Sequence, residues 1–221
     1  RQGLAFERAV GEHCSSIVGS NAEDDSARNV DGVVHLRRTG IAEIDEHMLC
    51  MESSEPLRSI CLCDAKLRKR AIEVINSDIT AALMHVHADK ELAKKVAELR
   101  GIKLTPPGAF EGVTHNDIHI GNVCMKPTYD SDGRIVDFHR ALLIDWESCL
   151  PIGAGTQRVP MITRWEQTCP DKADPDFDKI SLKKVVSLIQ ENKCARLVTP
   201  FIPKANDLSS SIKVDGAASK E

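Results

Sequence analysis

Apolar residues near the N-terminus recur mostly every three or four positions, which is the spacing of one face of an amphipathic helix. The residues that follow this spacing are Leu4, Phe6, Val10, Cys14 and Ile17. A polar, acidic stretch, residues 19–28, comes directly afterwards and interrupts the pattern. The sequence therefore predicts a helix over residues 4–18 and a loop after it.

Two short apolar segments come next, Val33–Arg37 and His47–Glu52, with a turn-rich centre between them. Such a pair is typical of two antiparallel strands. Beyond Pro56 the spacing becomes helical and predicts a long helix over residues 67–86. Its apolar face consists of Ile72, Ile75, Ile79, Leu83 and Val86.

The segment after this long helix is interpreted as an insertion over about residues 88–112. It begins with a charged stretch of helical pattern, residues 90–100, and ends in a loop that contains two Pro residues and a Gly. Pro and Gly residues interrupt helices and favour turns.

Two further strands are predicted over residues 122–125 and 141–144. The long loop between them contains Asp130-Ser131-Asp132-Gly133, a sequence that favours a turn. A final helix is predicted over residues 177–190. The tail, residues 203–221, is rich in Ser, Lys and Asp and is predicted to be disordered.

Composition narrows the class of protein. The chain has 221 residues, of which 42% are hydrophobic and 28% charged, enough for one large domain or two lobes. Lys and Arg total 29 against 33 Asp and Glu. The sequence contains no run of basic residues long enough to bind along a phosphate backbone, so nucleic acid is not an expected partner. No apolar run reaches the roughly 20 residues of a membrane-spanning helix, and the N-terminus does not resemble a signal peptide. We expect an intracellular protein, cytoplasmic or nuclear, without a membrane partner.

The eight cysteines are scattered, and most lie in apolar segments, which favours reduced, partly buried thiols over a disulfide framework. Cys61 and Cys63 form the one close pair. No second Cys or His pair lies at zinc-finger spacing from them, so a structural zinc site is not expected.

Polar residues that could take part in a reaction lie at the ends of the last two predicted strands. Asp117 and Asn122 precede the first of these strands, and Asp145 follows the second. If the strands pair as a hairpin, Asn122 and Asp145 lie side by side, and their oxygen atoms are hard ligands suited to Mg²⁺. Asp117 would then accept the proton of an attacking hydroxyl, which completes the parts needed for phosphoryl transfer. The alternative is a loop in which Asp117 and Asn122 only cap nearby backbone groups.

The stretch HNDIHIGN, residues 115–122, resembles the catalytic loop of the protein-kinase-like superfamily, which includes the aminoglycoside- and choline-type phosphotransferases. LLIDWE, residues 142–147, resembles the strand that ends in the magnesium-binding Asp of that superfamily. Asp-Trp-Glu in place of Asp-Phe-Gly is similar to small-molecule kinases and to the fungal-type kinase-like family. GTQRVPMITRW, residues 155–165, resembles the activation segment of the fungal-type family.

The resemblance implies an α+β, two-lobed fold. Residues 1–54 would form a partial N-lobe, with a helix and a small antiparallel sheet, and the hinge. Residues 55–202 would form a shortened, mostly helical C-lobe. Asp178-x-x-Ser181-Leu182 resembles the start of the helix that anchors this lobe.

The resemblance also implies the roles of individual residues, with ATP and Mg²⁺ as cofactors. Asp117, Asn122 and Asp145 would be catalytic, and the latter two would hold Mg²⁺. His115 would orient the loop from the core side. In the N-lobe, Glu7 would pair with the lysine that anchors the nucleotide, with Glu12 as the alternative. The nucleotide pocket would be lined by Met51 at its back and by the hinge residues Glu52, Ser53 and Ser54.

Three functions remain open. The first is a kinase that transfers the γ-phosphoryl group of ATP to a protein Ser or Thr. A small-molecule hydroxyl acceptor is the second, because Asp-Trp-Glu and His119 are similar to small-molecule kinases. The third is a pseudokinase or kinase fragment that acts as a binding scaffold. This third function is supported because the family's glycine-rich loop and strand lysine would precede Glu7, where few residues remain. Asn116 also replaces the Arg that is common in the family.

Overall fold

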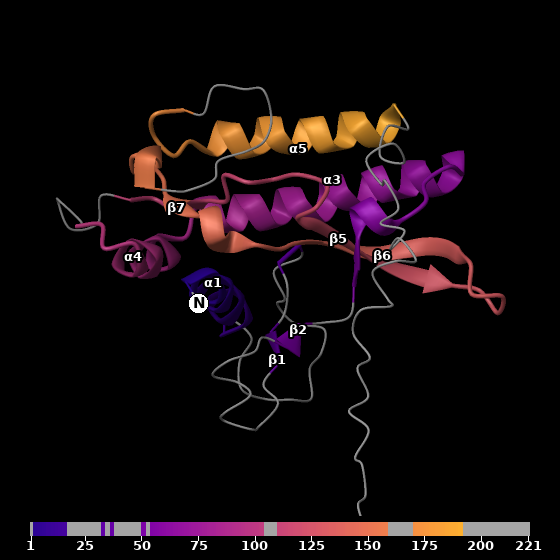
Figure 1. The fold of residues 1–221 in the computed structure, drawn as a ribbon, viewed down its shortest axis with the longest axis horizontal. Helices are drawn as coiled ribbons and strands as arrows, with labels where there is room; N and C mark the ends of the chain where they lie inside the picture. The colour runs from indigo at the N-terminus through magenta and orange to yellow at the C-terminus, as the bar shows by residue number, and fades with distance from the viewer. Residues whose placement is uncertain are drawn as a thin grey trace, which may run out of the picture.

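The computed structural model describes residues 2–16, 32–33, 36–37, 50–51, 54–103, 110–158 and 170–191. Within these ranges, helices combine with small antiparallel sheets, so the predicted α+β class is confirmed (Figure 1). The helices are α1 Gln2–Ser16, α3 Ala65–His87, α4 Lys90–Leu99 and α5 Pro175–Gln190, with short 3-10 turns η1 Leu57–Ser59, η2 Trp146–Ser148 and η3 Thr156–Arg158. The strands are β1 Leu36–Arg37, β2 Cys50–Met51, β3 Glu55–Pro56, β4 Val113–Thr114, β5 Val123–Tyr129, β6 Ile135–Leu143 and β7 Leu150–Pro151.

Helix α3 is the central element of the fold. It packs against β6 on one side and against α5 on the other (Figure 1). Its carboxylate N-cap, Asp64, accepts a hydrogen bond of 2.8 Å from the backbone N–H of Leu67, which satisfies one of the free donors at the helix start. The residues that it buries are Ala71, Val74, Ile75, Ile79, Ala82, Leu83 and Val86. The helix predicted over residues 67–86 is therefore confirmed.

The main sheet has the order β3-β5-β6, and β5 and β6 form an antiparallel hairpin. Asp130 closes the hairpin turn, because its carboxylate accepts hydrogen bonds from the backbone N–H groups of Asp132 and Arg134, and Gly133 takes a φ of 75° there. The predicted hairpin is confirmed, but the long loop predicted between its strands is wrong. The strands continue toward the turn through mixed polar and apolar residues, which include Pro127 in β5 and the buried Phe138 in β6.

The N-terminal elements lie beside this core. Helix α1 begins at Gln2 and packs against η2 and α4, with Phe6, Val10 and Cys14 buried. Strands β1 and β2 pair antiparallel, as predicted, although each has only two residues within the described ranges. The segment at residues 32–33 lies along the end of β6. Gly32 is required there, because a Cβ at this position would lie 2.2 Å from the carbonyl oxygen of Asp78.

Helix α4 is the helical segment that was predicted within the insertion. Asp89 caps it by accepting a hydrogen bond of 2.9 Å from the backbone N–H of Leu92. Its buried residues are Leu92, Ala93, Val96 and Ala97, and it packs against α1, β4 and β7. The insertion thus contributes to the core rather than projecting from it.

Several predicted features fall outside the described residues. They are Glu52 and Ser53 of the hinge, the greater part of the segment compared with an activation segment (residues 159–165), and the tail from residue 203. None of the helices that the structure describes is long and apolar enough to cross a membrane.

Candidate functional site

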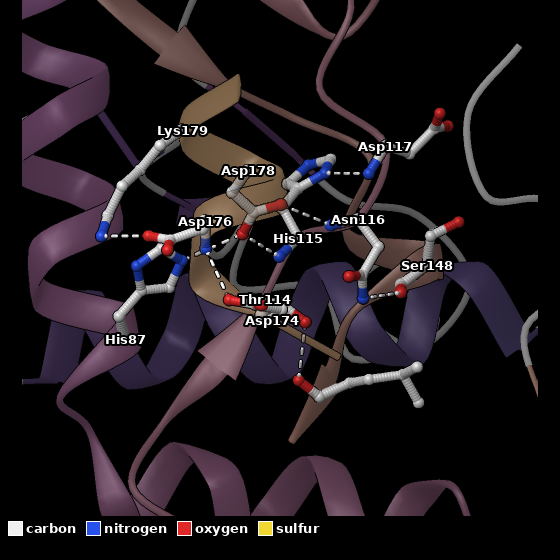
Figure 2. A network of polar contacts seen from close by, with 11 residues as sticks. His87, Thr114, His115, Asn116, Asp117, Ser148, Asp174, Asp176, Asp178 and Lys179 are labelled. Atoms are coloured by element: carbon white, nitrogen blue, oxygen red, sulfur yellow. Dashed lines mark hydrogen bonds and ion pairs between the residues drawn. The ribbon is translucent and has the colours of Figure 1, made fainter. Parts of the chain in front are cut away.

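The loop between β4 and β5 is held in place by one buried carboxylate. Asp178, in the first turn of α5, accepts hydrogen bonds of 2.8 Å from the backbone N–H groups of His115 and Asn116. Its Oδ2 also accepts a bond of 2.9 Å from Nε2 of His87, at the end of α3. Figure 2 shows these contacts converging on Asp178. One side chain with no solvent exposure therefore joins α3, α5 and the start of the loop.

The backbone bends sharply where Asp178 binds it. Asn116 has a φ of 66°, a left-handed conformation that Asn tolerates better than most residues. Its amide Nδ2 donates a bond of 3.0 Å to the carbonyl oxygen of Ser148 (Figure 2). Asn116 stands where the resembled family commonly has Arg, and here its side chain connects the loop to the segment after β6.

The ring of His115 connects the loop to the end of β6 and to Trp146. Its Nδ1 accepts a hydrogen bond of 3.2 Å from the backbone N–H of Asp117, so the proton lies on Nε2, which donates to the carbonyl oxygen of Ile144 at 3.0 Å. The ring also packs edge-on against Trp146, with centroids 4.6 Å apart. Burial lowers the pKa of His115, so the ring is neutral. The structure supports the interpretation that His115 orients the loop from the core side.

Asp117 lies at the rim of the loop with 8% of its surface exposed. The amide Nδ2 of Asn122 donates to its carbonyl oxygen at 2.9 Å and lies 3.3 Å from its Oδ2. Nε2 of His119 lies 3.6 Å from the same Oδ2. Because Nδ1 of His119 accepts a bond from the backbone N–H of Gly121, the proton of His119 is on Nε2 and faces Asp117.

These neighbours decide the charge of Asp117. Burial raises its pKa, but the hydrogen bonds that His119 and Asn122 direct at its carboxylate outweigh this effect, and the pKa lies below its ordinary value. Asp117 is therefore an ionised carboxylate at neutral pH. It is suited to accept a hydrogen bond from a substrate hydroxyl and to orient it.

Asn122 and Asp145 meet through the pairing of β5 and β6. Val123 lies opposite Leu143, and the backbone N–H of Ile144 donates to the carbonyl oxygen of Asn122 at 2.9 Å. Asp145, the next residue, has a φ of 65° and is exposed. The predicted pairing of the strands is present, and it brings Asn122 opposite Ile144, one residue before Asp145.

Asn122 and Asp145 carry oxygen atoms of the type that Mg²⁺ commonly takes as ligands. The amide nitrogen of Asn122 is turned to Asp117, and Asp145 carries an exposed carboxylate. In the part of the chain that the structure describes, no group of three or more His, Cys, Asp and Glu side chains could hold a metal ion. A cation with only two protein ligands is the arrangement in which Mg²⁺ takes its other ligands from phosphates and water.

Glu7 approaches the same segment from α1. Its Oε2 accepts a hydrogen bond of 2.8 Å from the backbone N–H of Trp146. Burial raises the pKa of Glu7 to about 7, the Trp146 N–H lowers it, and the charge of Asp145 raises it. Glu12, the alternative from the sequence, is exposed on the same helix. Of the two carboxylates, Glu7 lies at the candidate site.

Arg100 is a positioning residue that the sequence did not indicate. At the C-terminal end of α4, its guanidinium donates to the carbonyl oxygens of Cys149, at 3.2 Å, and of Glu147. The guanidinium carbon also lies 3.8 Å above the ring centre of Phe6 in α1, a cation–π arrangement. Only its charge at the end of a helix could have drawn attention to it. Arg100 holds the segment that follows Asp145 against α1 and α4.

Two residues that were expected to line the nucleotide pocket, Ser54 of the hinge and Met51 at the back of the pocket, lie within the described ranges. Ser54 is partly buried and directly precedes β3, whose Glu55 and Pro56 lie opposite Met125 and Cys124 of β5. Met51 is described only as backbone in β2. Ser54 therefore lies beside β5.

Comparisons with known proteins do not assign this chain: no family model matches it, and neither the curated proteins nor the solved structures that were searched contain a match.

Replacing the buried carboxylate should weaken the whole fold. Asp178→Ala leaves the N–H groups of His115 and Asn116 buried without an acceptor, and we expect the free energy of unfolding to fall by roughly 3–5 kcal/mol. Urea denaturation followed by circular dichroism measures the change. Asp176→Ala is the matched control, because Asp176 lies exposed on the same helix and bonds only Lys179 among side chains. Equal stability of the two variants would contradict the role of Asp178.

Glu7→Gln should change stability in a pH-dependent way. The unfolded chain ionises this carboxyl near its ordinary pKa of 4.5, whereas the folded pKa is about 7. The folded state is therefore penalised progressively as pH rises from 4.5 to 7, and fully above 7. Gln keeps an acceptor oxygen for Trp146 and carries no charge, so relative to the native chain it should gain about 1–3 kcal/mol between pH 4.5 and pH 8.

Denaturation curves at pH 4.5 and pH 8 test this expectation. Glu12→Gln, at an exposed position on the same helix, is the matched control. If Glu7→Gln gains no more than this control between the two pH values, the carboxyl of Glu7 is not held in a desolvated environment.

Proposed function

We propose that this chain is a kinase-like phosphotransferase that transfers the γ-phosphoryl group of ATP to a hydroxyl acceptor. The proposal rests on one observation. Asp117, Asn122 and Asp145 gather where β5 begins and β6 ends, on a loop whose backbone is fixed by Asp178.

The order and contacts of the elements support a kinase-like arrangement. Helix α1 presents Glu7 to the backbone of Trp146, next to the proposed magnesium ligand Asp145. Helix α5 begins with the segment that resembles the anchor of the C-terminal lobe, and its Asp178 binds the proposed catalytic loop. We propose on these grounds the two-lobed fold, with residues 1–54 in the smaller lobe.

The residues of the loop have separate roles in the proposed reaction. Asp117, ionised at neutral pH, would accept a hydrogen bond from the acceptor hydroxyl and orient its oxygen toward the phosphorus atom. His119 would keep Asp117 charged and would direct its Nε2–H to Oδ2. Asn122 would fix the carboxylate from the other side through its Nδ2.

Asn122 and Asp145 would together hold Mg²⁺ through their oxygen atoms. When bound, Mg²⁺ would neutralise the negative charge of the phosphates, which is a main part of catalysis in phosphoryl transfer. The hinge at Glu52–Ser54 would contact adenine through its backbone, as the resemblance implies. A protein Ser or Thr is the proposed acceptor, and a small-molecule alcohol is the alternative.

A scaffold without catalysis is the second candidate. The environment of Glu7 favours this candidate. Burial is the main cause of the raised pKa of Glu7, and no basic side chain of the described residues lowers that pKa. In the resembled family this Glu pairs with the lysine that anchors the nucleotide. A chain that lacks such a cation would bind partners through the same fold but would transfer phosphate slowly or not at all.

Binding of ATP with Mg²⁺ should raise the melting temperature of the purified chain. Ligand at about 100 times its dissociation constant adds about 2.7 kcal/mol to the folded state, which corresponds to a rise of roughly 5–10 °C for a chain of this size. Asp145→Ala should remove the magnesium-dependent part of the rise. Asp132→Ala, an exposed Asp in the hairpin turn, should keep it, and an equal loss in both variants would argue against Asp145 as a ligand.

Asp117→Asn should abolish phosphoryl transfer while the chain still binds ATP. The amide cannot accept the hydroxyl proton, and a loss of at least about 100-fold is expected for a positioned proton acceptor. Transfer of labelled phosphate to mixed Ser/Thr peptides and to small alcohols measures activity and distinguishes the two acceptor classes. Unchanged transfer in Asp117→Asn would refute the mechanism. ATP binding without transfer to any acceptor would favour the scaffold.

A further inference from the structure

Two exposed thiols lie next to each other before helix α3. The sulfur atoms of Cys61 and Cys63 are 3.2 Å apart, and both side chains are exposed. Cys14, Cys124 and Cys149, in contrast, are buried. The pair is therefore distinguished from these three by both access and proximity.

The backbone between η1 and α3 keeps both thiols on the solvent side. The residue between them, Leu62, is only 4% exposed and packs in the main core. Its carbonyl oxygen accepts a hydrogen bond of 3.3 Å from Arg68. Ile60 and Asp64, on either side, have extended backbone angles, and in an extended chain alternate residues point to the same face. Since Leu62 points into the core, Cys61 and Cys63 both point outward.

The environment makes Cys61 the more acidic thiol of the pair. The backbone N–H of Cys63, and then its thiol, stabilise the Cys61 thiolate and lower the pKa of Cys61, while the same contact raises the pKa of Cys63. Burial raises the pKa of Cys14 and of Cys149 to about 12. Because the thiolate is the reactive form, Cys61 is the nucleophile and Cys63 is placed to react with it.

Two structural roles do not fit this pair. A structural zinc site needs four ligands, and the described residues contain no group of three or more His, Cys, Asp and Glu side chains around a common point. A structural disulfide stabilises a protein mainly by closing a long loop in the unfolded chain, whereas a bond between Cys61 and Cys63 would close a very short one. Reactivity is the property that exposure and proximity favour.

We propose that Cys61 and Cys63 form a redox-reactive dithiol that exchanges with low-molecular-weight disulfides of the glutathione type. The Cys61 thiolate attacks one sulfur of glutathione disulfide, forms a mixed disulfide and releases one glutathione thiolate. Cys63 then loses its proton to solvent and attacks Sγ of Cys61, which releases the second glutathione as thiolate. The protein loses two electrons and two protons, and one glutathione disulfide becomes two glutathione molecules.

The reaction is reversible, because exposed disulfides are reduced more readily than buried structural ones. An excess of reduced glutathione returns the dithiol by the same two steps in reverse. The proposal does not depend on phosphoryl transfer, since it uses neither Asp117 nor the residues around it.

Peptide mapping of the full-length chain tests the proposal. The native protein is treated with glutathione disulfide, quenched with acid, alkylated with iodoacetamide and digested with trypsin. Cleavage after Arg58 and Lys66 gives the peptide SICLCDAK, residues 59–66, which contains this pair and no other cysteine. We expect this peptide to lack two hydrogen atoms, to carry neither glutathione nor an alkyl group, and to regain both thiols after reduced glutathione is added.

Two single variants separate the steps. Cys63→Ser should accumulate a stable glutathione adduct on Cys61, because the second thiol is missing. Cys61→Ser should form its adduct on Cys63 several-fold more slowly, because the more acidic thiol is missing. Leu62 stays buried in both variants, and circular dichroism checks that the fold is retained.

Three results would overturn the proposal. The first is a native peptide in which glutathione remains on Cys61 while Cys63 is still alkylated. The second is a disulfide from this peptide to any other cysteine of the chain. The third is a rate of ring closure that stays the same in urea, because closure would then not depend on the folded backbone that holds both thiols outward.

Discussion

The carboxylate of Asp178 is the contact on which the rest of the candidate site depends. It satisfies two consecutive backbone N–H groups at His115 and Asn116 and also bonds His87. Buried N–H groups without an acceptor are costly, and the left-handed conformation of Asn116 adds to that cost. Without Asp178 the bend would be lost, and Asp117, the next residue, would no longer be aimed at the rim of the loop. One helix residue, far away in sequence, therefore sets the position of the proposed catalytic residue.

The opposite side of the site is held by residues from α1 and α4. Glu7 accepts the N–H of Trp146, and Arg100 binds the carbonyl oxygens of Glu147 and Cys149 while its guanidinium lies over Phe6. The segment after Asp145 is thus fixed at three points by side chains rather than by regular pairing. Helix α4 belongs to the segment that was interpreted as an insertion, and it ends at Arg100. Arg100 joins α1 to the segment after Asp145, so α4 helps to position the proposed magnesium-binding segment.

The sequence predicted the parts of this structure that leave a periodic pattern. Helices α1, α3, α4 and α5 follow apolar residues at helical spacing. The pairing of β5 with β6 was also predicted, but it brings Asn122 opposite Ile144, one residue before the expected Asp145. The outer halves of β5 and β6 were missed because Pro127 and polar residues interrupt the apolar positions there, and the pairing shifts register after Lys126 and again after Thr128. Arg100 was missed for another reason: its partners lie 47 and 49 residues away, and such contacts leave no local signal.

The charges of the site suggest how its parts would act together. Asp117 is ionised, Asp145 is exposed beside it in the fold, and the charge of Asp145 raises the pKa of Glu7. Of these carboxyls, Glu7 is the one that burial keeps partly protonated near neutral pH. Under the proposed function, a cation held by Asn122 and Asp145 would remove the repulsion between Asp145 and Glu7. Glu7 would then release its proton more readily. Because Glu7 bonds the backbone of Trp146, its charge would strengthen that hydrogen bond and tighten α1 against the segment that holds the cation.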